Sequence, residues 1–228
     1  MKPYYQRGDV TLYHGDSAEL SQPCDLILTD PPYGVDFVSN HRPEKWGRIE
    51  GDGTDDRPGV IVRLDKAVGN LKHNRHVYVF GGSLDLSSLK LGSIVELVWD
   101  KGMLGMGDLS LPWGPQHEII RFGIYLPSKA NRERGDGALS ARLRRGSVLR
   151  SLRPNATRAK NHPTEKPLDI LRQMIESSSM FGETVYDPFA GSGSTLVAAA
   201  LEGRAAVGCE IEERYCETAA KRLDAEAF

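Results

Sequence analysis

Apolar and polar residues follow one another along the chain in patterns that predict strands and helices in turn. Short apolar runs are typical of strands that are covered on both faces. Apolar residues at helical spacing form a stripe along one side of a helix. Strands are predicted over residues 10–13, 26–28, 77–80, 94–99, 119–124, 184–187 and 205–209, and helices over 58–71, 166–179, 194–202 and 212–224. This alternation predicts an α/β fold with a mostly parallel sheet.

The helix predicted over 58–71 has one apolar stripe, which we expect to face the core. The stripe consists of Ile61, Val62, Leu64, Ala67, Val68 and Leu71. Pro167 stands near the start of the helix predicted over 166–179, where its missing N–H costs nothing. Gly203 follows the helix over 194–202 as a stop signal.

The composition is that of an ordinary soluble protein, with 39% hydrophobic and 26% charged residues among 228. We expect a single domain over residues 1–228. No run of eighteen apolar residues occurs, and the N-terminus lacks the apolar stretch of a signal peptide, so we expect a cytoplasmic protein without a membrane span. The three cysteines (Cys24, Cys209 and Cys216) form no CxxC pair, so buried thiols are expected and neither disulfides nor a metal site.

Positive charge is concentrated in one part of the chain. Residues 129–160 hold ten basic residues against Glu133 and Asp136, a net charge of +8. Because the whole chain has −2, the remainder carries −10. Such a segment is often a solvated face, but it is also the kind of surface that contacts nucleic acid. Its basic residues are Lys129, Arg132, Arg134, Arg142, Arg144, Arg145, Arg150, Arg153, Arg158 and Lys160.

An acidic residue and two prolines follow the strand predicted over 26–28. The sequence is Asp30-Pro31-Pro32-Tyr33. Consecutive prolines have a fixed φ and cannot donate to a sheet ladder, so the chain must leave the sheet in one stiff shape. Stiffness at this place suits a site better than a spacer.

A glycine-rich turn joins the strand predicted over 184–187 to the following helix. The strand ends in Asp187, the turn contains Gly191 and Gly193, and a second strand then ends in Glu210. Glycines let the backbone approach a ligand, and an acid about 20 residues further on is placed to bind ribose hydroxyls. The glycines are not followed by Gly-Lys-Ser or Gly-Lys-Thr, so the turn is not a phosphate-binding P-loop. The negative charge of Asp187 would also repel a pyrophosphate. These features favour S-adenosylmethionine (SAM), a nucleoside that carries a sulfonium and an ammonium but no phosphate.

Four motifs together resemble the amino-group DNA methyltransferases, which methylate N6 of adenine or N4 of cytosine. They are DPPYG at 30–34, HPTEKP at 162–167, DPFAGSGST at 187–195 and GCEIEERY at 208–215. Their order, with the catalytic motif before the SAM motif, resembles the β subclass. The resemblance implies a Rossmann-like, circularly permuted methyltransferase fold with seven strands in a mostly parallel sheet.

The resemblance also implies a catalytic role for Asp30, Pro31, Pro32 and Tyr33. The Asp30 carboxylate and the Pro31 carbonyl are expected to accept hydrogen bonds from the target amine, which makes its nitrogen a better nucleophile. The prolines hold that carbonyl in place, and Tyr33 offers a face on which a flipped base stacks. The amine then attacks the methyl group of SAM in line.

Contacts to SAM are implied for a larger set of residues. Glu210 is expected to bind the ribose, Asp187 the methionine part, and Asp16 the adenine. Lys166 is expected to pair with the SAM carboxylate, although HPTEKP could also serve only to cap a helix through Thr164. The full set is Asp16, Asp30, His162, Thr164, Lys166, Asp187, Pro188, Phe189, Gly191, Ser192, Gly193, Ser194, Thr195, Glu210 and Ile211.

Double-stranded DNA is the partner that the resemblance implies. The basic stretch 127–160 lies where the family has its target-recognition region. The polar stretch 36–58 is interpreted as a lid or DNA-contacting loop beside the active site, or else as a flexible loop without such a role. The sequence identifies neither the recognition sequence nor a cognate restriction endonuclease. The oligomeric state is open, and a homodimer is one expectation because β-subclass relatives often dimerise.

Adenine N6 is the target that we expect, because Asp in the first motif position is more typical of adenine enzymes; cytosine N4 is the alternative. Cytosine C5 methylation is disfavoured, because Pro23-Cys24 precedes a strand and the supporting motif is absent. Methylation of a glutamine amide or of RNA is disfavoured by the motif order. An inert DNA-binding module is disfavoured by the intact motif residues.

Overall fold

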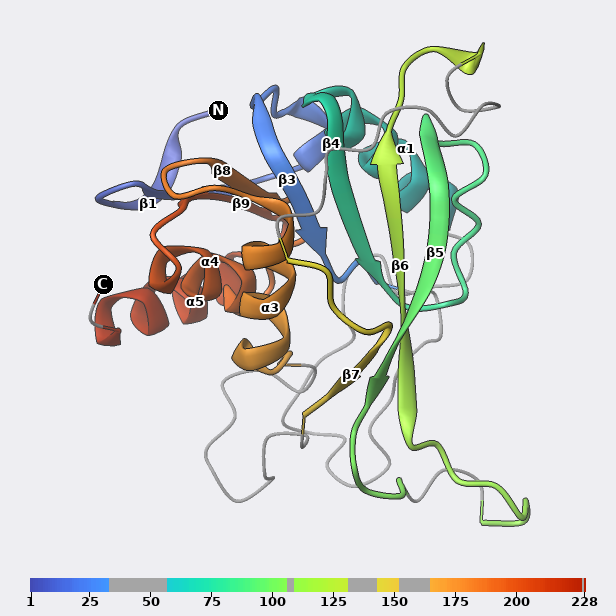
Figure 1. The fold of residues 1–228 in the computed structure, drawn as a ribbon. Coiled ribbons are helices and arrows are strands. Elements are labelled where there is room, and N and C mark those ends of the chain that lie inside the picture. The colour runs from blue at the N-terminus through green and yellow to red at the C-terminus, as the bar shows by residue number, and fades with distance from the viewer. Residues whose placement is uncertain (33–56, 106–108, 131–142, 152–164, 227) are drawn as a thin grey trace.

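Nine strands form one sheet in the part of the protein that the computed structural model describes, namely residues 1–32, 57–105, 109–130, 143–151, 165–226 and 228 (Figure 1). The spatial order of the strands is β1-β2-β9-β8-β3-β4-β6-β5-β7. Their bounds are β1 Pro3–Arg7, β2 Val10–His14, β3 Cys24–Thr29, β4 Leu71–Phe80, β5 Leu91–Asp100, β6 His117–Tyr125, β7 Val148–Arg150, β8 Thr184–Asp187 and β9 Ala205–Glu210.

The prediction of seven strands was wrong by two, since β1 and β7 were not predicted. Both lie at the edges of the sheet and expose most of their residues, so neither has the buried apolar pattern by which a strand is recognised. The fold class itself is confirmed. Neighbouring strands are parallel except where β1 meets β2 and where β6 meets β4 and β5.

Among the described residues, four α-helices with assigned bounds cover the sheet, and each lies where the sequence predicts one. They are α1 Arg57–Gly69, α3 Leu168–Ser178, α4 Ser194–Leu201 and α5 Glu213–Ala225; a short 3-10 helix, η1 Ser17–Glu19, precedes β3. Figure 1 shows α3, α4 and α5 on one face of the sheet and α1 on the other.

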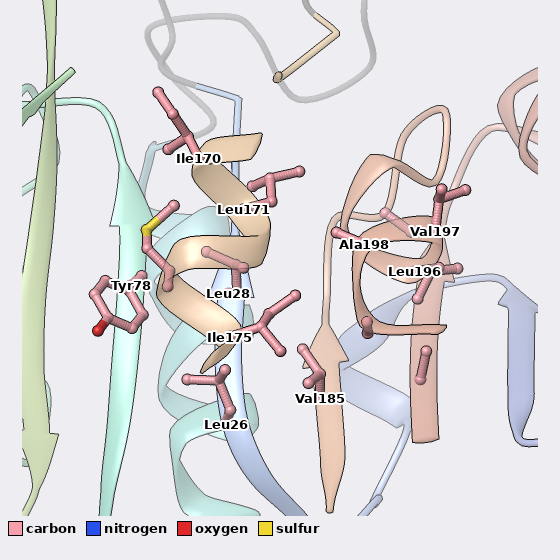
Figure 2. Packing of buried hydrophobic residues seen from close by; sticks show 14 of the residues in the cluster. Leu26, Leu28, Tyr78, Ile170, Leu171, Ile175, Val185, Leu196, Val197 and Ala198 are labelled. Atoms are coloured by element: carbon pink, nitrogen blue, oxygen red, sulfur yellow. The ribbon is translucent and has the colours of Figure 1, made fainter. Parts of the chain in front are cut away.

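The hydrophobic core therefore consists of two clusters, one on each face of the sheet. Side chains alternate between the two faces along a strand. Leu26 and Leu28 of β3 pack toward Ile175 of α3, as Figure 2 shows, while Ile27 of the same strand belongs to the cluster around Leu64 of α1. Because both faces are covered, every residue of β3 is buried, which explains its uninterrupted apolar run.

Two members of the apolar stripe predicted over 58–71 are wrong. Leu71 is the first residue of β4, because α1 ends at Gly69. Val60, Leu64, Ala67 and Val68 are buried, whereas Val62 is 55% exposed. Positions 60, 64, 67 and 68 are three or four residues apart and share one face, and position 62 lies on the opposite side of the helix. Apolar character alone did not distinguish Val62 from its neighbours.

The chain changes direction across the sheet between β8 and β3, which are parallel neighbours. From β8 it passes through α4 to β9 on one side, and from β3 through α1 to β4 on the other. At such a switch point the two connections leave in opposite directions and open a crevice at the carboxyl ends of the strands, which is where open α/β sheets bind ligands. The topology thus places a site beyond Thr29 and Asp187.

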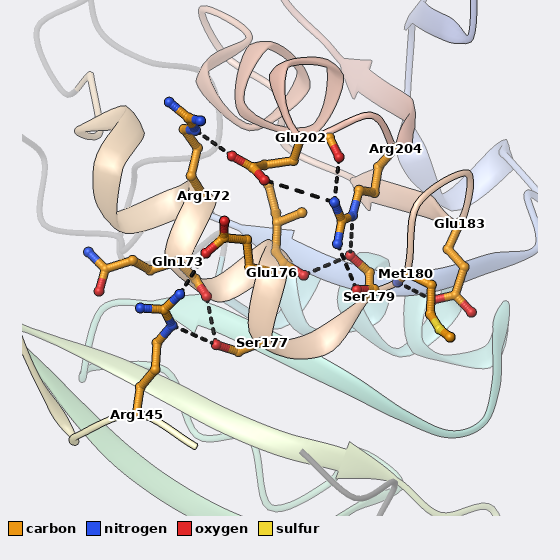
Figure 3. A network of polar contacts seen from close by, with 11 residues as sticks. Arg145, Arg172, Gln173, Glu176, Ser177, Ser179, Met180, Glu183, Glu202 and Arg204 are labelled. Carbon is orange, nitrogen blue, oxygen red and sulfur yellow. Dashed lines mark hydrogen bonds and ion pairs between the residues drawn. The ribbon is translucent and has the colours of Figure 1, made fainter. Parts of the chain in front are cut away.

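Hydrogen bonds around Arg204 fix α3 relative to α4 (Figure 3). The guanidinium of Arg204 donates to the carbonyl oxygen of Ser179 over 2.8 Å and to that of Glu202. Arg172 of α3 donates to the carboxylate of Glu202 over 2.5 Å. Since residues 165–167 directly precede α3 and the glycine-rich turn directly precedes α4, this network fixes the spacing between these two segments.

All three cysteines are buried free thiols, as predicted. Burial raises the pKa of the Cys24, Cys209 and Cys216 thiols to about 12, so each stays protonated at neutral pH. Within the described ranges, no helix is long and apolar enough to cross a membrane.

Leu64→Ala is expected to lower the free energy of unfolding by about 2–5 kcal/mol, because it leaves a cavity in a fully buried site. Val62→Ala on the same helix is the matched control, with an expected change within about 0.5 kcal/mol. Urea denaturation of both variants measures the difference. Equal losses would contradict the placement of the α1 face.

Candidate active site

Asp30 directly follows the fully buried strand β3 at the switch point. Pro31 is buried beside it, so the backbone leaves the sheet in the stiff form that the two prolines dictate. Tyr33, the last residue of the predicted catalytic motif, lies outside the described residues. The acid and the prolines of that motif are therefore placed at the carboxyl end of the sheet, as predicted.

The ammonium group of Lys166 is shared by two carboxylates. Its Nζ lies 2.9 Å from Oδ2 of Asp30 and 2.7 Å from Oε1 of Glu118, which is on β6. It also lies 5.0 Å from the centre of the Phe80 ring at the end of β4, a cation–π distance. The second oxygen of Glu118 is 3.2 Å from Nζ of Lys101. A buried cation thus joins the end of β3 to the start of β6.

Burial dominates the electrostatics of this cluster. It raises the pKa of Asp30 to about 7, although the Lys166 ammonium acts in the opposite direction. For Lys166 burial would lower the pKa, but Asp30 and Glu118 together hold it above its ordinary value. Burial also opposes ionisation of Glu118, whose pKa is nevertheless lowered by Lys166 and Lys101. Lys166 and Glu118 are consequently charged at neutral pH, and Asp30 is close to its titration point.

A second buried acid, Asp187, lies at the end of β8, the strand beside β3. Its Oδ1 accepts hydrogen bonds from Oγ1 of Thr29 over 2.6 Å and from the backbone N–H of Phe189 over 3.1 Å. Burial raises the pKa of Asp187 to about 6, against the effect of these bonds and of Thr195. The bond to Thr29 connects the predicted SAM motif directly to the strand that carries Asp30.

The glycine-rich turn leaves room for a ligand. Gly191 has φ +50°, and a Cβ added there would meet no atom within 4 Å. Gly193 has φ +78° and is needed for packing as well, since its Cβ would lie 3.0 Å from Cβ of Ala219. The turn residues Ser192, Ser194 and Thr195 are buried, as is Pro188, and Phe189 is partly buried.

Glu210 at the end of β9 is buried and shapes the same turn. Its carboxylate accepts the backbone N–H of Gly191 and that of Glu212, each over 2.8 Å. Burial raises the pKa of Glu210 to about 7, opposed by these two bonds. Ile211 follows, and its carbonyl oxygen lies 3.1 Å from Nε2 of His14. The predicted ribose-binding acid is therefore next to the glycine turn, as its spacing in the sequence indicated.

Asp16 has a protein partner that the sequence did not indicate. Arg63 of α1 binds its carboxylate with two hydrogen bonds of 2.8 and 2.7 Å, and Asp16 also accepts the N–H of Ala18 at the start of η1. Hydrogen bonding to Arg63 lowers the pKa of Asp16, so the group is ionised at neutral pH. Asp16 lies after β2, at the carboxyl edge that also holds Glu210.

Arg222 supports the glycine-rich turn from α5. Its guanidinium donates to Oγ of Ser194 over 2.8 Å and pairs with the carboxylate of Glu165 over 2.6 Å. Glu165 belongs to the HPTEKP motif, next to Lys166. Arg222 therefore joins Glu165 to the glycine-rich turn, and the helices that follow these two segments are also connected by Arg204.

The described members of the basic segment do not form one cluster. Arg150 ends β7 at the carboxyl edge, with its Nε 3.6 Å from Asp100. Arg145 instead binds Glu176 and Ser177 near the end of α3, as Figure 3 shows. Lys129 follows β6, whose antiparallel direction takes it to the opposite end of the sheet from Asp30. Arg144 is exposed before β7.

The remaining site predictions lie outside the described residues. They are the cofactor residues His162 and Thr164, most of the polar stretch 36–58, and the basic residues Arg132, Arg134, Arg142, Arg153, Arg158 and Lys160.

Sequence reasoning missed four charged residues that organise the site. They are Lys101, Glu118, Arg63 and Arg222, none of which belongs to a recognisable motif. The one available signal was an acid just before the strand predicted over 119–124. Such a residue becomes informative only when the pairing of β6 places it near Asp30.

The profile of a DNA methylase family of N6 and N4 methyltransferases matches residues 98–221, more than half of the chain. The protein belongs to this amino-group DNA methyltransferase family. This methyltransferase is 27% identical over 256 residues to the type II methyltransferase M2.DpnII of Streptococcus pneumoniae, with 99% of this chain and 93% of the relative covered. It is 28% identical over 249 residues to the DNA adenine methyltransferase YhdJ of Escherichia coli K12, with 94% and 82% covered.

Solved structures share the fold of the methyltransferase. The complex of M1.HpyAVI with SAM has a TM-score of 0.65 at 19% identity, covering 94% of this chain and 99% of the other. The PvuII DNA methyltransferase, described as cytosine-N4-specific, has a TM-score of 0.72 at 16% identity, covering 97% and 89%. The predicted fold class is confirmed by these likenesses.

Lys166→Met is expected to lower the free energy of unfolding by about 3–5 kcal/mol at pH 8, because it leaves the Asp30 and Glu118 carboxylates buried without their shared cation. The loss should shrink at pH 5.5. Removal of the ammonium raises the pKa of Asp30 further, so the folded variant takes up a proton there and is relieved of the charge.

Urea denaturation at the two pH values measures this difference. Lys221→Met, which removes an exposed ion pair with Glu217 on α5, is the control and should change little at either pH. A loss of equal size at both pH values would show that Lys166 does not neutralise a buried carboxylate.

Proposed function

We propose that this methyltransferase transfers a methyl group from SAM to N6 of adenine in double-stranded DNA. The observation that carries the proposal is the position of Asp30-Pro31-Pro32 beyond β3, next to Asp187 and the glycine-rich turn at the switch point. Within the proposal, residues 1–228 form one catalytic domain, in which 36–58 and 127–160 serve DNA contact and target recognition.

The residues at the carboxyl edge fit SAM. The missing Cβ of Gly191 leaves open space beside the turn, and two buried acids, Asp187 and Glu210, stand at the ends of β8 and β9. Acids suit a ligand that carries an ammonium and a sulfonium, and Glu210 is in the place typical of ribose binding. Asp16 and Lys166 are the further candidates for its adenine and carboxylate ends. When bound, SAM supplies a methyl group that is activated by the positive charge on its sulfur.

Asp30 and the carbonyl of Pro31 act on the target amine. An aromatic amine is a poor nucleophile because its lone pair is delocalised into the ring. Acceptors on its two N–H groups draw the nitrogen toward a pyramidal geometry, and the rigid diproline turn keeps the carbonyl acceptor in position without further ordering. In this proposal the Tyr33 ring stacks on the base after the base has left the duplex.

Asp30 also takes up the proton that the methylated amine releases. A general base is most effective when its pKa lies near the working pH. The pKa of Asp30 is raised to about 7 by burial, which is far above the value of an exposed carboxyl. Asp30 is thus ionised often enough to accept the amine and basic enough to receive its proton.

Two observations favour adenine over cytosine as the target base in this proposal. Asp rather than Ser opens the catalytic motif, and the relative YhdJ, similar over 94% of this chain, is described as a DNA adenine methyltransferase. The PvuII enzyme shares the fold and is described as cytosine-N4-specific, so the fold does not decide between the bases. Methylation of cytosine N4 is the second candidate for this reason.

Double-stranded DNA is proposed to approach the carboxyl edge. Arg150 is the described member of the basic segment that lies at this edge, and it is largely exposed. Phosphate contacts by such residues give affinity that falls with salt concentration. Lys129 follows β6 at the opposite end of the sheet, and Arg145 pairs with Glu176 of α3.

Asp30→Ala is expected to reduce methyl transfer by at least about a hundredfold, because it removes one acceptor and the base. SAM affinity should change far less. The test incubates the protein with SAM and unmethylated mixed-sequence duplex DNA and then identifies the digested nucleosides by mass spectrometry. The wild-type chain should yield N6-methyladenine.

Asp65→Ala, at an exposed position of α1, is the control and should retain full activity. Full activity of Asp30→Ala would refute the mechanism. Formation of N4-methylcytosine by the wild type would keep the mechanism and correct the base.

Gly191→Ala is expected to weaken SAM binding by at least about tenfold, because the added Cβ occupies the space beside the turn. Gly182→Ala is a matched control: Gly182 also has a positive φ, +77°, and its Cβ would also meet no atom within 4 Å, but it lies in the turn before β8, away from the site. Both variants should lose similar stability from backbone strain. Isothermal titration calorimetry with SAM measures the affinity of both variants. Equal affinities of Gly191→Ala and Gly182→Ala would show that the glycine-rich turn is not part of the cofactor site.

A further inference from the structure

Glu118 reaches the candidate active site from β6, an element that contributes no motif to it. Its two carboxylate oxygens bind different cations: Oε1 lies 2.7 Å from Nζ of Lys166, and Oε2 lies 3.2 Å from Nζ of Lys101. Lys166 in turn lies 2.9 Å from Asp30. The result is a row of alternating charges, Lys101, Glu118, Lys166 and Asp30, drawn from four separate places along the chain.

The contact of Lys166 with Glu118 is shorter than its contact with Asp30. Charge-assisted hydrogen bonds of 2.7–2.9 Å are strong, so both Asp30 and Glu118 stabilise the Lys166 ammonium. Lys101 adds a second cation to Glu118, and Asp187 adds a further negative charge near Asp30. Lys166 has the largest charge effect on both Asp30 and Glu118.

We propose that Glu118 is a positioning residue for methyl transfer: by sharing the Lys166 ammonium with Asp30, it sets how strongly the Asp30 carboxylate binds the target amine and its proton. This inference rests on the proposed function of Asp30. It adds to that function a residue outside the motifs and a physical reason for the buried lysine.

The sharing of the Lys166 ammonium between Asp30 and Glu118 determines how basic the Asp30 carboxylate is. An ammonium that serves Asp30 alone would make that carboxylate a weak base, because the ionised form would be strongly favoured. With no ammonium nearby, burial would keep Asp30 protonated and unable to accept a hydrogen bond from the amine. Sharing holds Asp30 between these limits.

The proton balance follows from this arrangement. The amine nitrogen gains the methyl group and releases one proton, which forms an O–H bond on Asp30 and later passes to water. The methyl donor loses its positive charge when its carbon–sulfur bond breaks. The released proton carries an equal positive charge away, so the reaction is balanced. Lys166 stays protonated throughout, so it tunes the base without taking part in the transfer.

Glu118→Gln tests the proposal because it keeps the shape of the side chain and removes its charge. Because the amide that replaces the carboxylate is neutral, Lys166 then pairs chiefly with Asp30 and lowers its pKa. The single-turnover rate of methyl transfer at pH 8 should fall about tenfold, and the acidic limb of its pH profile should move to lower pH. SAM affinity should stay within about twofold of the wild type.

Lys101→Met is expected to move the acidic limb in the opposite direction. Without Lys101, the negative charge of Glu118 acts more strongly on Lys166 and draws it from Asp30, whose pKa then rises. Shifts of opposite sign in two variants are not the outcome of a general loss of stability. Lys101 is partly exposed, so this variant also tests the proposal if Glu118→Gln does not fold.

Glu96→Gln is the matched control, since Glu96 is on neighbouring β5, is largely exposed and pairs with Arg121. It should change neither rate nor profile. If the wild type methylates DNA but both variants keep the rate within about twofold and the limb in place, the role of Glu118 is overturned. If the wild type methylates no DNA, the proposed function fails instead.

Discussion

The buried ammonium of Lys166 is the interaction on which the candidate site depends. Removing a cation and two carboxylates from water is expensive, and such a group is tolerated only when the charges compensate one another at short range. The contacts of 2.9 Å to Asp30 and 2.7 Å to Glu118 provide that compensation. They require β3, β6 and the start of α3 to meet at one point. The site therefore exists only when both halves of the sheet are assembled.

The topology of the sheet explains why the chemistry is located there. Between β8 and β3 the connections diverge, and the carboxyl ends of these two neighbouring strands are the place where open α/β sheets bind ligands. The bond from Thr29 to Asp187 crosses this boundary and links the strand of the catalytic motif to that of the cofactor motif. The networks around Arg204 and Arg222 hold the two motifs together from the helical side. A reaction between a base and a cofactor needs such fixed spacing.

Prediction from sequence succeeded where one local rule was sufficient. Asp30 follows one recognisable strand, Asp187 and Glu210 end two others, and the carboxyl ends of parallel strands meet at one edge of a sheet. The edge strands β1 and β7 were missed because exposure removes the apolar pattern. Glu118 was missed for a different reason: its role depends on the antiparallel pairing of β6 with β4, a long-range contact that no local pattern encodes. The expected partners of Asp16 and Lys166 were ligand groups, and the structure adds Arg63, Asp30 and Glu118 as protein partners.

The pH dependence of methyl transfer by the wild-type chain tests the central claim most directly. The measurement is the single-turnover rate with saturating SAM and duplex DNA between pH 5.5 and 9. Asp30 must be ionised to accept the amine, and burial raises its pKa to about 7. The account therefore predicts a rate that rises with pH through about 7 and then levels off. A rate that stays constant over the whole range would show that the ionisation of Asp30 does not govern the reaction.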